Sequence, residues 1–469
     1  MADDLGYGDP RCYNKDSKIP TPHIDQLASQ GVIFTDAHSP SALCSPSRYG
    51  LLTGRYAWRT RLQKGVLLPY DPPLIEPGRM TLASMLKTAG YSTAWIGKWH
   101  MGLEWATKDG APAENAIDRE ALYNLKTDEK RQWNIDFSQL IEGGPTQLGF
   151  DYFYGTAGCC TSDPPYCFIE NDHTVVVPTQ MSREEWRGLP GFLPGPMADD
   201  WSQEDCDFTL TRKAQDFIDL QVEQKPRRPF FLVLALSSPH NPWLVPADNR
   251  GKSKEGPRGD LVTVVDGAVG HITDHLEKNG LTGETLLIVT SDHGAMRGAA
   301  GHQSAGDFRG NKASAWEGGH RIPFVVRWPG MIQPRTTSSY TISLIDLLAT
   351  LAKITGSPLP VDAAEDSRDV LAGILGQADK RPSDEALIFD SGLGDFAVRQ
   401  GRWKVMIGAR AGPPNTVVGE IAAAGAHLLY DLAADPAETT DLSNQHPEII
   451  RSMIGLLDVY RSRGRSRAK

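Results

Sequence analysis

The chain of 469 residues lacks several features that mark whole classes of protein. It has no run of about 18 consecutive apolar residues, so we expect no membrane-spanning helix. Lys and Arg number 48 against 58 Asp and Glu, which gives a net charge of −10. This charge disfavours nucleic acid and anionic membranes, and we expect neither as a partner. An anionic substrate would therefore need a local pocket of Lys, Arg and His side chains.

Cysteine is scarce, which excludes a small disulfide-rich scaffold. Three of the cysteines crowd into residues 159–167 with a C-C-x6-C spacing. That spacing fits no standard zinc motif, although metal binding by the trio stays open. The six cysteines are Cys12, Cys44, Cys159, Cys160, Cys167 and Cys206.

Apolar runs typical of buried strands alternate with helical patterns over most of the chain. Continuous apolar strands between helices indicate a parallel sheet that is covered on both faces. We expect strands at 32–34, 91–96, 230–236 and 286–290, and helices at 22–31, 81–89, 208–222, 267–278 and 343–356.

The pattern changes after about residue 377, where short apolar runs are separated by turn residues. Such runs are typical of an antiparallel sheet. We therefore predict two domains, a larger α/β domain at 1–376 and a smaller α+β domain at 377–469. In the second domain we expect strands at 385–389, 396–400, 403–407 and 428–431, and a helix at 447–461.

Polar side chains follow three of the expected strands at the point where each strand ends. Lys98 and His100 follow the second strand, His240 follows the third, and Asp292-His293 follows the fourth. In open α/β sheets, ligands bind outside the carboxyl ends of the strands. The pattern suggests one site assembled from several strand ends.

Carboxylates gather at two of these places. Asp3 and Asp4 stand where a first strand would end, and Asp292 ends another strand. Adjacent carboxylates are costly unless they are solvated or bound to a cation, so an oxygen-rich site for Ca²⁺ or Mg²⁺ is one interpretation. Simple exposure near a terminus is the other. His293 is an uncommon type of ligand for calcium.

The other candidate residues also have purely structural interpretations when each is taken alone. Arg48 follows Cys44 by four residues, one turn if a helix begins there, and could stabilise an oxyanion. The alternative is a surface arginine beside a buried structural thiol. Lys98 and Lys312 supply positive charge for an anion, and His100 and His240 can move protons near neutral pH. The alternatives are solvated lysines and packed histidines.

Taken together, these residues fall in ordered motifs that resemble type I, formylglycine-dependent sulfatases of the arylsulfatase kind. The similarity is greatest to carbohydrate sulfatases such as N-acetylgalactosamine-6-sulfatase. The motifs are Asp3-Asp4-Leu5-Gly6-Tyr7-Gly8-Asp9, C-x-P-S-R-x-x-L-L-T-G-R at 44–55, G-K-W-H-x-G at 97–102, G-x-K-x-x-x-x-E-G-G-x-R-x-P at 310–323, and Leu429-Tyr430-Asp431-Leu432 with Asp435-Pro436 and Glu438.

The resemblance implies an alkaline-phosphatase-like α/β sandwich. Its large, mostly parallel central sheet would be flanked by helices, and a smaller C-terminal domain would carry an antiparallel sheet and a helix. In this family an apolar strand normally precedes the Asp-Asp pair, whereas here only Met1 and Ala2 do. We therefore expect a truncated or misassigned start. No signal peptide is evident, and the resemblance suggests a periplasmic, secreted or lysosomal protein.

The resemblance also implies a cofactor and a maturation partner. A formylglycine-generating enzyme would oxidise Cys44 to formylglycine, and the hydrated aldehyde would attack the sulfur of a sulfate monoester. The implied metal is Ca²⁺, with Mg²⁺ as an alternative. The implied metal ligands are Asp3, Asp4, Cys44 as its modified form, Asp292 and His293.

The remaining catalytic roles also follow from the resemblance. Lys98, His240 and Lys312 would bind the sulfate, and His240 or Lys312 would protonate the leaving alcohol. Arg48 would steady the nucleophile. His100 would then remove a proton so that sulfate is expelled.

The substrate is expected to be a sulfated sugar or another sulfate monoester. A polar, proline-containing loop at 158–172 resembles substrate loops of carbohydrate sulfatases. In or beside it, Asp163 and His173 are candidates for contacts with sugar hydroxyls, or they structure the loop. Two rival functions stay open, namely hydrolysis of phosphate or phosphonate monoesters within the same superfamily, and non-catalytic sugar binding.

Overall fold

The computed structural model describes residues 1–117, 129–224, 227–408 and 427–467. The chain divides into two compact units, each built from segments that are distant in sequence. The first unit contains Met1–Asp3 and Leu67–Thr282, and the second contains Asp4–Val66 and Gly283–Lys469. The chain passes from one unit to the other at the Asp3–Asp4 peptide bond. The domain boundary that we predicted near residue 376 stays a prediction.

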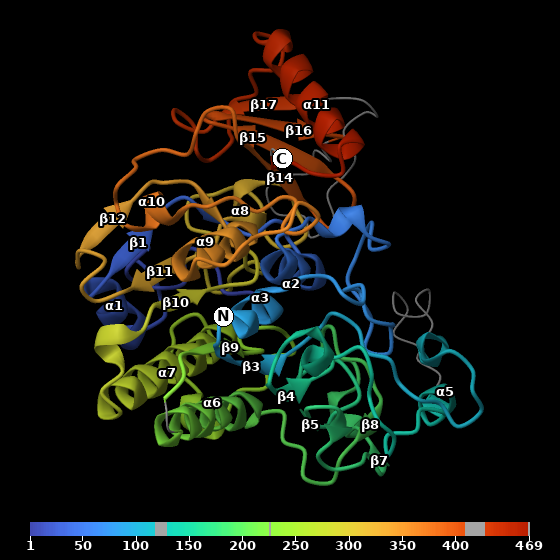
Figure 1. Cartoon of the computed structure of the whole chain (residues 1–469). Helices are drawn as coiled ribbons and strands as arrows, with labels where there is room; N and C mark the ends of the chain where they lie inside the picture. Colours follow the sequence, from blue (N-terminus) through green and yellow to red (C-terminus); the bar gives the residue numbers. More distant parts are fainter. Residues whose placement is uncertain (118–128, 225–226, 409–426, 468–469) are drawn as a thin grey trace. The chain divides into compact units, whose positions relative to one another are not determined.

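The first unit contains a five-stranded sheet with a parallel centre (Figure 1). β3 (Ser92–Lys98) lies between β4 (Tyr152–Thr156) and β9 (Phe230–Ala235) and is parallel to both. β5 (Ile169–Glu170) and β6 (His173–Thr174) extend the sheet beyond β4 in antiparallel pairs. The strands that we predicted at 91–96 and 230–236 are confirmed as β3 and β9.

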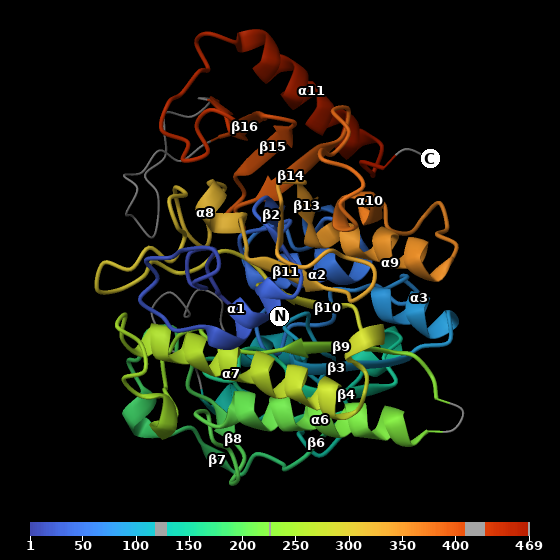
Figure 2. The ribbon, with the colours of Figure 1, turned by 90° about the vertical axis from the view of Figure 1, so that its left-hand side faces the viewer.

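Two long helices of the first unit lie side by side (Figures 1 and 2). α6 (Cys206–Glu223) contacts β3 and β9 and buries an apolar stripe that includes Leu210, Ala214 and Phe217. α7 (Pro257–Lys278) is much longer than the helix predicted at 267–278. Its first half was missed because it buries charged and glycine residues, which hide the apolar periodicity.

A second sheet, in the second unit, has the strand order β10-β11-β1-β12. β11 (Phe324–Arg327) is antiparallel to both β10 (Leu287–Thr290) and β1 (Val32–Phe34), and β12 (Thr336–Ser338) is parallel to β1. The strands predicted at 32–34 and 286–290 therefore exist. However, their shared neighbour is antiparallel, because an apolar run indicates burial and not the direction of its partner.

The C-terminal part of the second unit forms an antiparallel sheet in chain order, as predicted (Figure 1). Its strands are β14 (Ala386–Asp390), β15 (Phe396–Gln400), β16 (Trp403–Ile407) and β17 (Leu428–Asp431). α11 (Pro447–Ser462) packs against β15 and β16 and buries Ile450, Met453 and Leu457.

The shorter elements connect these sheets. The helices predicted at 22–31, 81–89 and 343–356 form as α1 (Pro22–Ser29), α3 (Leu82–Thr88) and α9 (Leu347–Thr355). No helix among the described residues combines the length and apolar character needed to cross a membrane. The other short elements are α2 (Cys44–Thr53), α5 (Glu129–Gln132), α8 (Glu317–His320), α10 (Leu371–Ile374), β2 (Ala37–His38), β7 (Gln180–Met181), β8 (Pro196–Met197) and β13 (Ile342–Ser343).

Candidate active site

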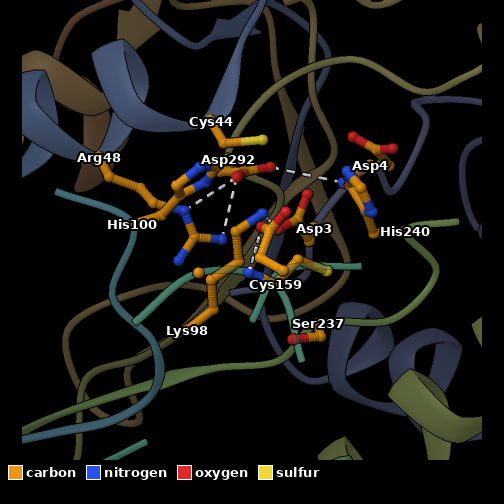
Figure 3. Close-up of polar contacts among 12 residues, drawn as sticks. Asp3, Asp4, Cys44, Arg48, Lys98, His100, Cys159, Ser237, His240 and Asp292 are labelled. Carbon is orange, nitrogen blue, oxygen red and sulfur yellow. Dashed lines mark hydrogen bonds and ion pairs between the residues drawn. The ribbon is translucent and has the colours of Figure 1, made fainter. Parts of the chain in front are cut away.

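Cys44 is the first residue of α2 in the second unit and is buried, with an exposed fraction of 2%. Its Sγ lies 3.2 Å from Nε2 of His293. Arg48 follows one helical turn later, as predicted, and is fully buried. Its Nε and Nη2 donate to Oδ2 of Asp292 at 3.1 and 3.0 Å (Figure 3). The cysteine and arginine of the motif therefore both contact the segment that follows β10.

Two buried carboxylates of the second unit lie beside Cys44. Asp4 and Asp292 are each 0% exposed, and the backbone N–H of Asp4 donates to Oδ1 of Asp292 at 3.4 Å (Figure 3). Nζ of Lys312 lies 2.8 and 3.0 Å from the two carboxylate oxygens of Asp4. Asp4 has a φ of +65°, which is uncommon for a residue other than glycine. Such strained conformations concentrate at functional sites.

His293 lies between these carboxylates. Its Nε2 is 3.4 Å from Oδ1 of Asp4 and 3.5 Å from Oδ1 of Asp292. Burial lowers the pKa of this imidazole, but the negative charges of Asp292, Cys44 and Asp4 outweigh burial and raise the pKa to about 9. The surroundings of His293 thus favour a positive charge at this point.

The donor set fits a hard divalent cation. Ligand atoms of Cys44, Asp292 and His293 all lie within 4.8 Å of one another, and a carboxylate oxygen of Asp4 lies within the same distance of Cys44. Carboxylate oxygens are the ligands that Ca²⁺ and Mg²⁺ prefer. Oδ1 of Asp292 accepts the N–H of Asp4 and lies 3.5 Å from Nε2 of His293, so this oxygen faces the cluster. We call Asp4, Cys44, Asp292 and His293 the carboxylate cluster.

The first unit contains a second set of predicted site residues. Nζ of Lys98, at the end of β3, lies 2.5 Å from Oδ2 of Asp3, and both side chains are fully buried (Figure 3). The amino group of Met1 donates to the carbonyl oxygen of Leu234 at 2.8 Å, and the N–H of Leu236 donates to Met1 at 3.0 Å. The residues before Asp3 therefore hydrogen-bond to the end of β9.

The two predicted catalytic histidines of the first unit differ in their surroundings. His100 is buried, has a φ of +60°, and places Nε2 2.9 Å from the carbonyl oxygen of Leu67. His240 is partly exposed, and one of its ring nitrogens lies within 4.8 Å of a carboxylate oxygen of Asp3. The structure thus brings Asp3, Lys98 and His240 together in this unit.

Sequence reasoning missed Asp207, which supports the segment that carries His240. Its buried carboxylate accepts the backbone N–H groups of Ser237 and Ser238, each at 2.9 Å. The N–H of Asp3 in turn donates to the carbonyl oxygen of Ser238 at 3.2 Å. One carboxylate therefore fixes the loop that holds both Asp3 and His240. The sequence gives no local signal for this role, because Asp207 lies inside a helical pattern.

The residues proposed for substrate contact have clear local partners. Oδ2 of Asp163 accepts the N–H of Cys159 at 2.7 Å, which structures the loop. His173 is exposed, and its Nδ1 lies 2.6 Å from Asp172. No disulfide joins the six cysteines, all of which lie among the described residues. The crowded trio does not form a set of metal donors, and Cys160 instead lies near Cys206 and Asp207.

This combination of fold and site defines a class of protein, and comparison with known proteins agrees with it. The sequence model of the sulfatase family matches residues 1–357. The chain therefore belongs to the sulfatase family, whose members are sulfuric ester hydrolases. The family resemblance stated from the motifs is confirmed.

Individual relatives extend over nearly the whole chain. N-acetylgalactosamine-6-O-sulfatase of Bacteroides thetaiotaomicron is 34% identical over 507 aligned positions, which cover 99% of this chain and 92% of the relative. Human arylsulfatase A is 33% identical over 477 positions, covering 97% of this chain and 85% of the relative.

Solved structures confirm the predicted fold class. A Bacteroides thetaiotaomicron structure, described under the metabolism of multiple glycosaminoglycans, has a TM-score of 0.83, 32% identity and 98% coverage of both chains. A sulfatase from Pseudoalteromonas sp. has a TM-score of 0.74 at 23% identity, covers 98% of this chain and 89% of its own, and supports the fold alone. The alkaline-phosphatase-like α/β architecture, with a mostly parallel sheet and a small antiparallel one, is thereby confirmed.

Proposed function

We propose that the protein removes sulfate from a sulfated carbohydrate, and that 6-sulfated N-acetylgalactosamine is the first substrate to test. The observation that carries the proposal is the buried carboxylate cluster around Cys44 in a chain of the sulfatase family. The sugar is suggested by the N-acetylgalactosamine-6-O-sulfatase relative, which aligns over 99% of the chain.

Cys44 is proposed to act as formylglycine, made by a formylglycine-generating enzyme. Formylglycine, once hydrated, would supply a geminal diol as the nucleophile, a group that none of the ordinary side chains offers. The side chain of Cys44 is buried at the start of α2, so the modifying enzyme would act before folding is complete. An exported location, whether periplasmic, secreted or lysosomal, is proposed from the similarity to sulfatases.

Ca²⁺ is the proposed metal, with Mg²⁺ as the alternative. A divalent cation supplies Lewis-acid stabilisation of negative charge on a sulfate ester. Two carboxylates and His293 of the cluster would hold it together with position 44, and Asp3 would be a further ligand.

The chain's own side chains would perform the remaining steps. Lys98, His240 and Lys312 would bind sulfate oxygens, because the lysine ammonium groups complement the anion and the imidazole can donate a hydrogen bond. Arg48 would hold Asp292 in place through its paired N–H groups. His240 or Lys312 would protonate the leaving alcohol, and His100 would take a proton to release sulfate. Asp163 would contact the sugar.

Mass spectrometry of the peptide containing Cys44 tests the first requirement, since thiol and aldehyde differ in mass. Protein coexpressed with a formylglycine-generating enzyme is then assayed on sulfated monosaccharides, including the 6-sulfate of N-acetylgalactosamine. Matched aryl sulfate, phosphate and phosphonate esters are compared by kcat/KM. A large preference for a phosphorus ester, or aldehyde-containing protein that binds sugars without turnover, would contradict the proposal.

A further inference from the structure

A second buried cluster in the second unit takes no part in the chemistry proposed above. Its members come from the segment before Cys44, from α8 and the residue after it, and from the C-terminal part of the chain. We call it the Lys404 network. Its residues are Asp36, His38, Glu317, His320, Arg321, Arg399, Lys404 and Glu438.

Lys404 lies at the centre of this network and is 0% exposed. Its Nζ is 2.9 Å from Oε1 of Glu317, 2.8 Å from Oε1 of Glu438 and 3.0 Å from Nε2 of His320. The contacts with Glu317 and His320 are hydrogen bonds, and the contact with Glu438 is an ion pair. Lys404 therefore connects strand β16 to both ends of the short helix α8.

Two neighbouring imidazoles of the network are held neutral by burial. Nε2 of His320 lies 3.0 Å from Nζ of Lys404, and its Nδ1 lies 3.0 Å from Nδ1 of His38. Nε2 of His38 lies 2.8 Å from Oδ1 of Asp36 and 2.9 Å from Nη1 of Arg399. Burial lowers the pKa of His38 to about 4, and burial together with the ammonium of Lys404 holds the pKa of His320 well below its usual range.

The helix held by Lys404 contacts both segments that carry the nucleophile and the metal ligands. The N–H of Gly294, next to His293, donates to the carbonyl oxygen of Gly319 at 3.0 Å. A Cβ at Gly294 would meet the carbonyl oxygen of Gly318 at 2.1 Å, so this approach requires glycine. On the other side, the N–H of Ser39 donates to the carbonyl oxygen of His320 at 2.8 Å.

Glu438 completes the attachment from the C-terminal part. Its Oε2 accepts the backbone N–H of Glu317, the first residue of α8, at 2.7 Å. Glu438 has a φ of +55°, a strained conformation that persists only where its surroundings determine it. Lys404 and Glu438 both lie beyond residues 1–357, the part matched by the sulfatase family.

The Lys404 network is poorly suited to bind a metal ion. His38, Glu317 and His320 do offer ligand atoms within 4.8 Å of one another. However, the ammonium of Lys404 already contacts Glu317 and His320, and the guanidinium of Arg321 takes the other oxygen of Glu317. The charges of Lys404 and Arg321 therefore repel a metal cation, and these two side chains already neutralise Glu317.

We propose that Lys404, together with Glu438, is a positioning residue for the active site. Through α8 it would hold the Asp292–Gly294 segment and the segment before Cys44 in the geometry that the cation and the nucleophile require. This inference rests on the proposed function. It assigns a role in the reaction to a C-terminal strand that supplies no group to the substrate.

The test compares Lys404→Met, Lys404→Arg and Glu438→Gln with Arg402→Met. Arg402 lies two residues before Lys404 and has a side chain that is 54% exposed, so it is the matched control. Two readouts are taken. The first is kcat and KM per molecule of formylglycine enzyme, measured well below each melting temperature. The second is the Ca²⁺ concentration at the midpoint of the rise in melting temperature.

We expect Lys404→Met to lower kcat and apparent Ca²⁺ affinity by about 10- to 100-fold, the range seen when a residue behind a metal ligand is lost. KM should change little. Glu438→Gln keeps the side-chain shape, so its kcat and apparent Ca²⁺ affinity should fall less than those of Lys404→Met. Lys404→Arg keeps the positive charge and should also retain part of both quantities. Arg402→Met should match the wild type.

Unchanged kcat and Ca²⁺ midpoint in Lys404→Met, with only a lower melting temperature, would overturn the inference. If that variant does not fold, unchanged values in Glu438→Gln would overturn it equally. Failure of the proposed function has a different signature, because wild-type enzyme with confirmed formylglycine would then hydrolyse no sulfate ester. The Ca²⁺ midpoint would still test positioning in that case.

Discussion

Two buried clusters of the second unit both combine carboxyl groups with histidines, yet the pKa values of their histidines are shifted in opposite directions. In the carboxylate cluster, the charges of Asp292 and Asp4 raise the pKa of His293 to about 9 despite burial. In the Lys404 network, burial and the ammonium of Lys404 hold the pKa of His320 well below its usual range. Residue type alone therefore does not define a metal site.

The difference lies in how the charges are arranged. In the first cluster, Oδ1 of Asp4 and Oδ1 of Asp292 both lie near Nε2 of His293. Arg48 binds Oδ2 of Asp292, and Lys312 contacts both oxygens of Asp4. In the second cluster, Lys404 lies between the carboxylates of Glu317 and Glu438. The first arrangement favours an added cation, and the second excludes one. The predictions below test this contrast.

The largest effect is expected from Cys44→Ala. Removing a covalent nucleophile should lower kcat by about 10⁴-fold or more. Any Lys404 variant should cost far less, because it leaves the nucleophile present. Turnover is measured with the preferred sulfate ester, and circular dichroism and thermal melting check that the fold is intact. Cys12→Ala, at a half-buried cysteine of the same unit, is the control. Near-normal turnover of Cys44→Ala would refute the mechanism.

Removing the metal should have the next largest effect. Chelation should lower turnover by about 10³-fold, because the cation stabilises charge in the transition state. Adding Ca²⁺ at 100 times its Kd should restore turnover and stabilise the folded protein by about 2.7 kcal/mol. The measurement is a melting temperature followed against Ca²⁺ concentration.

Two aspartate variants make the metal test specific to one cluster. Asp292→Asn should lose the Ca²⁺ response. Asp36→Asn should keep it, although loss of the partner of Arg399 should destabilise the protein by about 3 kcal/mol. If Asp36→Asn abolished the Ca²⁺ response and Asp292→Asn did not, the two clusters would have been assigned the wrong way round.

The sequence predicts one of these clusters much better than the other. Cys44, Arg48 and Lys312 stand in motifs with fixed spacing, so the sequence alone identifies them. Lys404 stands in Trp403-Lys404-Val405-Met406, within a strand whose place was predicted correctly. Polar residues of antiparallel strands usually face solvent, and nothing local shows that Lys404 faces Glu317, 87 residues earlier in the chain.

The fold, too, was predicted well where partners are adjacent in sequence and less well where they are distant. Strands 396–400 and 403–407 were predicted at their observed bounds, because turn residues separate them and their partners are adjacent in sequence. β1 and β10 were also found, but both pair with β11 in the antiparallel direction. Such pairing depends on contacts between distant segments, which a local pattern does not contain.

A moderate effect on stability is expected from the pH response of His38. Its pKa is lowered from 6.5 to about 4 by burial, so the folded protein resists a proton that the unfolded chain accepts below pH 6.5. Stability should therefore fall as pH decreases from about 6.5 toward 4, and His38 should add nothing to the pH dependence above that window. The expected loss between pH 7 and pH 5 is about 2 kcal/mol.

Denaturant unfolding at several pH values measures this effect. His38→Gln keeps a donor for Asp36 but does not titrate, so it should be less stable at pH 7 and lose less on acidification. Carboxylates titrate in both proteins. The difference between the two curves of unfolding free energy against pH therefore gives the contribution of the His38 imidazole. Equal pH dependence in the two proteins would show that His38 is not held neutral by the network.

The smallest effect is expected at an exposed ion pair that lies close to Lys404 along the chain. Nε of Arg402 donates to Oδ1 of Asp431 at 2.6 Å, but the arginine side chain is 54% exposed. Water and salt screen such pairs, and many contribute nothing measurable to stability. Arg402→Met, Asp431→Asn and the double variant should therefore melt close to the wild type, with additive shifts.

A matching double-mutant cycle on Lys404 and Glu438 should be strongly non-additive, because their shared contacts are fully buried. If both cycles were additive, burial would not distinguish the two pairs, and the Lys404 network would be no more than a set of independent contacts.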